Sequence, residues 1–213
     1  MSFPQYLYRF FNQKDHRDQF IQGLIRFGRL EAYKEIEDEQ RKDKDEGDPR
    51  GKYKTDKQIY LKISNQTGKV VEHGIKLGDI NISGYSPNNF FIVSATDEKV
   101  NVEKISEKFG KYVVKINNPQ KLLDLLNKNR KFPWSVGKIV LERVKYDKDN
   151  YLEIEESNPH LPFGYYYAQK PQMFSDEMEW RFVLIGSGID ELEDKFVVIE
   201  IGSIENIITR IDL

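Results

Sequence analysis

The sequence predicts an α+β fold, in which a single domain of short mixed or antiparallel strands carries flanking helices. Short apolar or alternating runs, such as 111–116 and 137–144, are typical of strands. The leucines of 120–130, in contrast, form one stripe at helical spacing. The chain has 213 residues and no internal repeat, so one domain over 1–213 is expected.

The first elements follow from aromatic and apolar spacing. The segment 5–11 is dense in aromatic residues and predicts a short buried strand. The apolar residues between Phe20 and Ile25 recur at helical spacing, which predicts a helix of about three turns that ends near Gly28.

A charged segment then interrupts the pattern. Residues 31–50 hold nine acidic and five basic side chains, most of which cannot be buried. We expect an acidic loop insertion over 35–58. A calcium loop is not expected there, because Gly47 and Lys54 stand where an EF-hand needs oxygen ligands.

The remaining elements are predicted from runs that the turn residues separate. Strands are expected over 60–63, 89–96, 111–116, 137–144, 177–185 and 195–201, and helices over 101–110 and 120–130. The strand at 89–96 is an apolar run and is expected to be central in the sheet.

Composition excludes several classes of function. The net charge of −2 provides no global basic field for nucleic acid. The absence of cysteine excludes disulfides, thiolate catalysis and cysteine-ligated zinc, and three scattered histidines argue against a histidine-rich metal site. No signal peptide or membrane span is evident, so a cytoplasmic protein without a membrane partner is expected.

The strongest candidate site is Glu177-x-Glu179-Trp-Arg181. If this segment is a strand, Glu177, Glu179 and Arg181 share one face. One interpretation is an exposed face on which Arg181 neutralises Glu179. The other is a cleft in which one carboxylate binds a sugar hydroxyl and the other activates a nucleophile.

Arg9 is a second candidate, because it is a basic residue within an aromatic strand. It is either an edge arginine that extends its charge to water or a bidentate clamp for a phosphate or diphosphate.

The order of Arg9, a central strand ending at Ser94, and Glu177-x-Glu179 resembles the Arg, Ser, Glu-x-Glu signature of the ADP-ribosyltransferase fold. Most of the chain, including 29–47, Phe109-Gly-Lys-Tyr112 and Lys170…Phe174…Glu-x-Glu-Trp-Arg181, also resembles a poorly characterised bacterial family associated with abortive infection and phage defence.

The transferase resemblance implies a split sheet and NAD as a substrate. It implies that Arg9 grips the NAD diphosphate or the nicotinamide ribose and that Ser94 orders the strand beneath the nicotinamide. Glu179 would bind the ribose 2′-hydroxyl and stabilise an oxocarbenium-like charge, while Glu177 orients or deprotonates the acceptor.

The other implied ligand contacts are Arg181 and an aromatic residue that stacks on nicotinamide, for which Tyr33 and Tyr85 are the candidates. The middle motif departs from the usual Ser-Thr-Ser form, since it is Ser94-Ala95-Thr96 here.

Three functions remain open. The first is an NAD-consuming ADP-ribosyltransferase or glycohydrolase of a bacterial defence or toxin system, with a protein or nucleic-acid acceptor and an antitoxin or defence partner. The second is a non-catalytic interaction protein, a defence regulator or phage-encoded inhibitor, that uses the acidic segment 35–48. The third is a Mg²⁺-dependent nuclease whose carboxylates converge from Glu177, Glu179 and the acidic loop.

Overall fold

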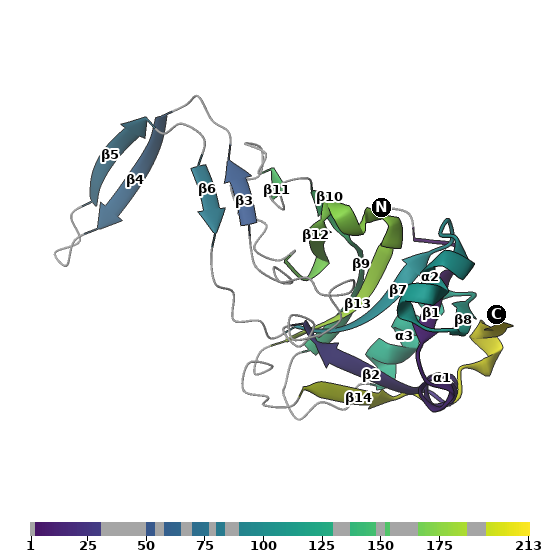
Figure 1. Cartoon of the computed structure of the whole chain (residues 1–213). Coiled ribbons are helices and arrows are strands. Elements are labelled where there is room, and N and C mark those ends of the chain that lie inside the picture. The colour runs from purple at the N-terminus through teal and green to yellow at the C-terminus, as the bar shows by residue number, and fades with distance from the viewer. Residues whose placement is uncertain are drawn as a thin grey trace.

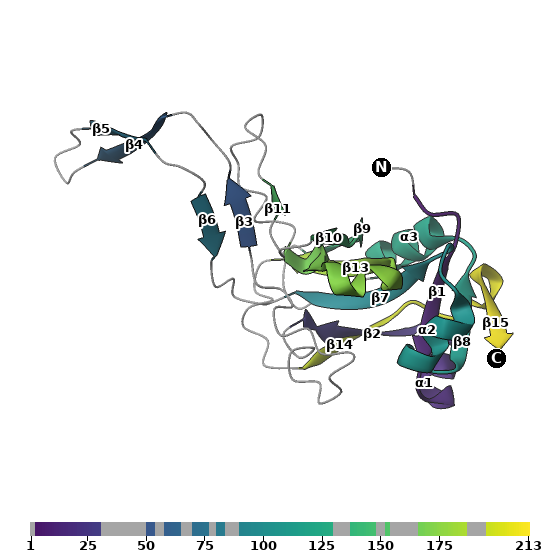
Figure 2. The same ribbon diagram turned by 45° about the horizontal axis from the view of Figure 1, so that its top comes forward.

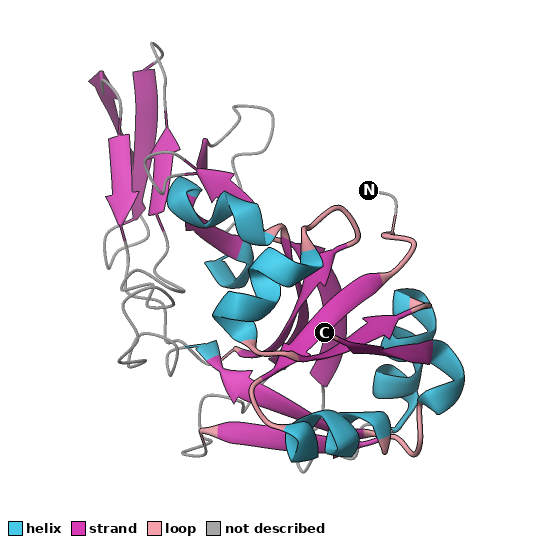
Figure 3. Cartoon of the chain, turned by 45° about the vertical axis from the view of Figure 1, so that its right-hand side comes forward, coloured by secondary structure: helices cyan, strands magenta, loops and turns pink. Residues whose placement is uncertain are grey.

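The structure, a computed structural model, is an α+β fold built on a mostly antiparallel sheet (Figures 1 and 3). It describes residues 3–30, 50–53, 58–64, 70–76, 80–83, 90–129, 137–147, 152–153, 166–186 and 195–213. The main sheet contains eight strands: β1 (Leu7–Phe11), β2 (Leu24–Arg29), β7 (Phe91–Asp97), β8 (Tyr112–Ile116), β9 (Gly137–Arg143), β13 (Glu179–Gly186), β14 (Phe196–Glu200) and β15 (Ile208–Asp212).

Strand β7 is central in this sheet, as predicted for 89–96, because it pairs with three other strands. One edge of β7 pairs with β13, which continues to β9. The other edge is shared by two strands. Strand β1 pairs with the end of β7 at Thr96 and Asp97, and β2 pairs with its beginning at Phe91 and Ile92.

The sheet therefore divides at β7. Strands β1, β8 and β15 continue it in one direction and β2 and β14 in another, as Figure 2 shows to the right of β7 and below it. We call the opening between β1 and β2, beside residues 93–95 of β7, the fork. All of the strand pairs in this sheet are antiparallel.

The predicted helix of about three turns, expected to end near Gly28, is wrong in its second half. Helix α1 covers only Lys14–Ile21, and the next residues form β2. Gly23 ends the helical path with a φ of 87°, a conformation that favours glycine. A Cβ at Gly23 would also lie 1.8 Å from the carbonyl oxygen of Gly202. After this turn Ile25 and Phe27 alternate into the core, which the helical spacing had obscured.

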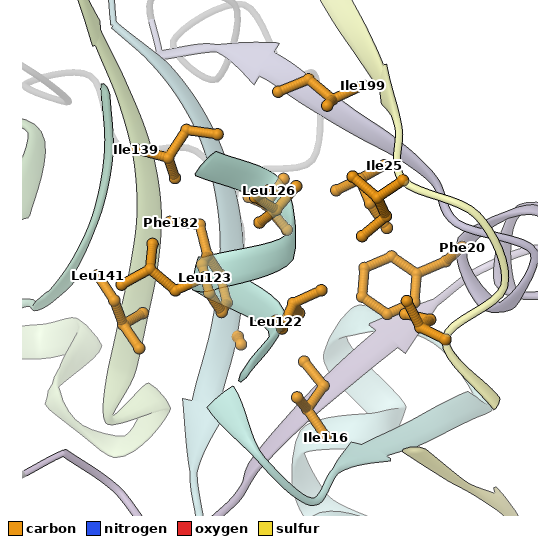
Figure 4. Packing of buried hydrophobic residues seen from close by; sticks show 14 of the residues in the cluster. Phe20, Ile25, Ile116, Leu122, Leu123, Leu126, Ile139, Leu141, Phe182 and Ile199 are labelled. Carbon is orange, nitrogen blue, oxygen red and sulfur yellow. The ribbon is translucent and has the colours of Figure 1, made fainter. Parts of the chain in front are cut away.

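Both later helices are confirmed. Helix α2 (Val102–Phe109) begins after Asn101, whose side chain caps it, and stops at Gly110, where φ is 116°. Helix α3 (Pro119–Asn129) lies across the core (Figure 4) and buries Leu122 and Leu126. Each such leucine contributes roughly 1.5–3 kcal/mol when it is fully buried.

The other predicted strands are confirmed as elements, with one omission. The strand at 195–201 is β14, but it is not the last, because η5 (Glu205–Ile207) and β15 follow it. The sequence did not predict β15 because most of its side chains are exposed and give no apolar run; among the described strands it pairs with β8.

Three smaller sheets accompany the main one. They are β10 (Lys145–Asp147) with β12 (Gln169–Pro171), β3 (Arg50–Tyr53) with β6 (Ile80–Ser83) and β11 (Leu152–Glu153), and β4 (Gln58–Ser64) with β5 (Val70–Lys76). The predicted loop insertion at 35–58 thus contains β3 and the first residue of β4. The acidic run that precedes β3 lies outside the described residues. Within the part of the chain that is described, no helix is long and apolar enough to cross a membrane.

Candidate active site

The site begins at a left-handed turn before β13. The sequence predicted Glu177 as part of the strand, but Glu177 ends the 3-10 helix η3 (Gln172–Glu177) and β13 starts at Glu179. Met178 between them has a φ of 43° and is the one non-glycine residue with positive φ among those described. Its carbonyl accepts a hydrogen bond from the Asp97 amide at 3.0 Å. The simple alternation predicted from 177 is therefore wrong at its first step.

From Glu179 onward the predicted alternation is confirmed. Glu179 and Arg181 stand opposite Thr96 and Ser94 of β7 in the antiparallel register, so these side chains share one face of the sheet. The intervening Trp180 belongs to the main core on the other face. The first residues of β13 thus separate an apolar face from a charged one.

Arg181 and Glu179 form a buried ion pair. Arg181 Nε donates to Glu179 Oε1 at 2.8 Å and Nη2 donates to Oε2 at 3.2 Å. The exposed fractions of the two residues are 1% and 4%. Arg181 Nη1 also donates to the Tyr167 carbonyl at 2.6 Å. The neutralisation of Glu179 by Arg181 considered from sequence is present, but it occurs in the interior rather than on an exposed face.

Lys170 joins the two carboxylates. Its Nζ lies 2.8 Å from Glu177 Oε2 and 2.9 Å from Glu179 Oε2. Lys108 of α2 binds the other oxygen of Glu177. Two like charges therefore remain buried side by side because cations lie between and beside them.

These neighbours keep Glu179 ionised. Burial alone would raise the pKa of its carboxyl group, but the charges of Arg181 and Lys170, with hydrogen bonds from Arg181 and Ser94, hold the pKa well below its usual range. The amide of Glu179 donates to the Tyr146 hydroxyl at 2.8 Å. Burial, and then the charge of Glu179, raise the pKa of Tyr146.

Arg9 reaches this site from the other side of β7. Strand β1 lies between β7 and β8, so Arg9 is not the edge arginine that one interpretation predicted. It leaves β1 on the same face as Leu7 and Phe11, which pack on the main core. Its Nη1 donates to the carbonyl oxygen of Ser94 at the fork, where this edge of β7 has no strand partner among the described residues, although β13 pairs with the opposite edge.

One cavity of about 310 Å³ unites the predicted residues. Arg9, Ser94, Glu177, Glu179 and Arg181 all line it, and its volume lies within the range of roughly 300–1,000 Å³ typical of small-molecule sites. Figure 2 shows β1, β7 and β13, the strands that carry most of these residues, converging on one region.

Two predicted residues and one predicted surface are not tested by this geometry. Tyr33, Tyr85 and the acidic segment 35–48 lie outside the described residues.

Sequence reasoning assigned no role to four residues of this site. Lys170 and Lys108 pair with the carboxylates. Tyr146 accepts a hydrogen bond from the Glu179 amide, and His16 lines the cavity. The one signal available was Lys170, which belongs to the motif that ends in Glu-x-Glu-Trp-Arg181. The other three come from separate elements, with no spacing that relates them to Glu179.

At Glu177 and Glu179 the arrangement favours a polar organic group over an anion, because both side chains are carboxylates. Among the described residues no group of three or more histidine, aspartate or glutamate side chains is placed to hold a metal. The two carboxylates are already bound by Lys108, Lys170 and Arg181. The ionised Glu179 is a fixed negative charge that can stabilise a developing positive one, and its remaining lone pairs can accept a hydroxyl hydrogen bond.

Comparison of the chain with protein-family models, with curated proteins and with solved structures finds no match.

Proposed function

We propose that this chain is an NAD-consuming enzyme of the ADP-ribosyltransferase type, which releases nicotinamide and passes ADP-ribose to a macromolecule or to water. The observation that carries the proposal is that Arg9, Ser94 and Glu179, from three distant stretches of sequence, line one cavity at a fork in the sheet. The order of these residues along the chain, and the division of the sheet at β7, both agree with the resemblance to that fold.

The chemistry requires a negative charge near the sugar. Cleavage of the bond between the nicotinamide nitrogen and ribose C1′ leaves both bonding electrons on nicotinamide, which departs neutral, and positive charge develops on the ribose. An ionised carboxylate beside that sugar stabilises the transition state more than the ground state. Glu179 has this property because Arg181, Lys170 and Ser94 keep it ionised.

Glu179 is suited to electrostatic stabilisation and not to proton transfer. A general base works best with a pKa near the working pH, and the pKa of Glu179 is far lower. The acceptor would attack C1′ with an oxygen or nitrogen lone pair and release its proton to Glu177 or to solvent. Glu177 lines the same cavity and lies next to Glu179 through Lys170.

The Mg²⁺-dependent nuclease is disfavoured by the same contacts. A metal ion bound by Glu177 and Glu179 would have to displace Lys170, whose nitrogen lies within 2.9 Å of both. The resemblance to the phage-defence family makes a toxin or defence role the biological setting that we propose.

The test is release of nicotinamide from NAD, followed by liquid chromatography. We expect release by the unaltered chain and a decrease of about 100-fold or more for Glu179→Gln, the scale found when one electrostatic contact to a transition state is removed. Ser94→Ala is expected to lower the rate by about 10-fold, because one charge-assisted hydrogen bond to Glu179 is lost.

Glu107→Gln is the matched control, since it neutralises an exposed carboxylate on α2 and is expected to keep the full rate. Thermal unfolding of each variant separates loss of chemistry from loss of fold, and Ser94→Ala serves if Glu179→Gln does not fold. The proposal is overturned if the unaltered chain neither binds NAD nor releases nicotinamide, or if folded Glu179→Gln is as active as Glu107→Gln.

A further inference from the structure

Strand β14 forms one free edge of the main sheet. Among the described strands it pairs with β2 alone, and it lies at the boundary of the sheet in Figures 1 and 2. The amide of Ile201 donates to the carbonyl of Gly23 at 3.0 Å, so Ile201 and every second residue before it direct their backbone groups toward β2. The backbone N–H and C=O groups of Phe196, Val198 and Glu200 therefore point away from the sheet, where another strand can pair with them.

The side chains on this edge are also unusual. Phe196 and Val198 are 44% and 49% exposed, on the face opposite to Ile199, which belongs to the main core. Proteins commonly protect a free edge with charged side chains. The strand at the other end of the sheet, β15, carries Arg210, which forms an ion pair with Glu205 at 3.2 Å. The two exposed apolar side chains of β14 point instead to an edge that another chain covers.

Two unpaired charges lie beside these apolar side chains. Arg26 of β2 stands opposite Val198 in the register, and its guanidinium stacks on Phe196 at 3.9 Å from the ring centre. Glu200 is the last residue of β14 and lies on the same face. Arg26 and Glu200 are both exposed, and neither forms an ion pair with another described residue. The edge thus presents both signs of charge to a neighbour.

We propose that β14 pairs with β14 of a second copy of this chain, antiparallel about a two-fold axis at Val198. In this register Val198 lies opposite Val198 of the second copy, and Phe196 lies opposite Glu200 of the second copy. Arg26, stacked on Phe196, then meets that carboxylate. The two-fold axis repeats the contact, so both unpaired charges of each copy gain a partner.

The edge is complementary to itself, and this favours a second copy over an unrelated chain. The same three residues supply the outward backbone groups, the apolar centre and the negative charge, and Arg26 supplies the positive one. A shift of one residue would turn the apolar side chains of the second copy to the other face. One strand edge is small beside the roughly 1,200–2,000 Å² of stable interfaces. We therefore expect a dimer that depends on concentration, with a Kd of about 10–500 µM.

Sedimentation equilibrium of the full chain, from about 5 µM to about 1 mM, tests the dimer. Arg26→Glu and Glu200→Arg each place like charges together in both contacts, and each is expected to weaken dimerisation by about 10-fold or more. An equimolar mixture of the two variants is expected to dimerise again, because the mixed dimer has opposite charges at both contacts. Arg210→Glu reverses an exposed charge at the other end of the sheet and is expected to dimerise as the unaltered chain does.

Three results would overturn the proposal: an unaltered chain that stays monomeric over this range, an Arg26→Glu variant that dimerises as well as Arg210→Glu, or a mixture that stays monomeric. The mixture excludes a pair within one chain, which mixing cannot repair. Thermal unfolding shows that each variant is folded, and Glu200→Arg against Arg210→Glu decides the question if Arg26→Glu does not fold. The dimer does not depend on the proposed function, since nicotinamide release can be present or absent in either case.

Discussion

Removal of the Lys170 charge tests the buried cluster at the candidate active site. Lys170→Met keeps the length of the side chain and its apolar part but removes the ammonium group that lies 2.8 Å from Glu177 and 2.9 Å from Glu179. Each charge-assisted hydrogen bond contributes about 1.5–3 kcal/mol. The variant no longer has to desolvate that ammonium group, which offsets part of the loss.

Each carboxylate also retains one cation in this variant, Lys108 for Glu177 and Arg181 for Glu179. We therefore expect the free energy of unfolding to fall by about 2–4 kcal/mol, less than for a fully orphaned buried charge. Urea denaturation at neutral pH measures the change.

Two comparisons make the result specific. Arg210→Gln breaks a pair whose side chains are 53% and 66% exposed, and it is expected to cost less than about 1 kcal/mol. In a double-mutant cycle, Lys170→Met and Glu177→Gln should show a coupling energy above about 1 kcal/mol. A Lys170→Met variant as stable as the unaltered chain, with no coupling to Glu177→Gln, would show that the Lys170 charge does not stabilise the buried carboxylates.

Three further predictions concern stability. The pKa of Glu179 is depressed in the folded state, so its contribution to stability is present above the unfolded pKa of about 4.3 and is lost as the pH falls toward the folded value. Glu179→Gln should therefore lack this part of the acid-denaturation profile. An unchanged profile would contradict the assignment. The raised pKa of Tyr146 gives a contribution to stability that is present below the unfolded pKa of about 10 and lost as the pH rises through the folded value. Tyr146→Phe should therefore flatten the fall in unfolding free energy at alkaline pH, and it should cost about 1–3 kcal/mol at neutral pH because the buried amide of Glu179 is left unpaired. Urea denaturation at a series of pH values checks the Glu179 and Tyr146 predictions. Gly23→Ala should lower stability by more than about 2 kcal/mol, because the new Cβ meets the Gly202 carbonyl at 1.8 Å; a thermal midpoint within 1–2 °C of the original, a shift that corresponds to roughly 0.5 kcal/mol, would contradict that account of the turn.

Local patterns predicted the elements that carry one uniform signal. The leucines of α3 recur at helical spacing, and β7 is a continuous apolar run that is buried on both faces. The predicted helix failed beyond Ile21, where the apolar spacing of Leu24 and Ile25 suits a helix or a strand equally well. The left-handed turn at Gly23, which depends on close contact with Gly202, decided between them.

The site was predictable only in part for a related reason. Arg9, Ser94 and Glu179 carry chemistry-bearing side chains on strands, and a motif order singled them out. Lys108 binds Glu177 although the two residues are 69 positions apart in sequence. Glu177 lies beside Glu179 because of the left-handed turn at Met178, not because the two residues alternate along one strand. Such contacts follow from tertiary packing and have no local signal.

The most direct test of the account is a crystal structure of the Glu179→Gln variant grown with NAD, in which slow turnover keeps the dinucleotide intact. The nicotinamide ribose is expected against residue 179 and Ser94, with the diphosphate beside Arg9. NAD bound elsewhere, or bound in the reverse orientation with the adenine at residue 179, would contradict it.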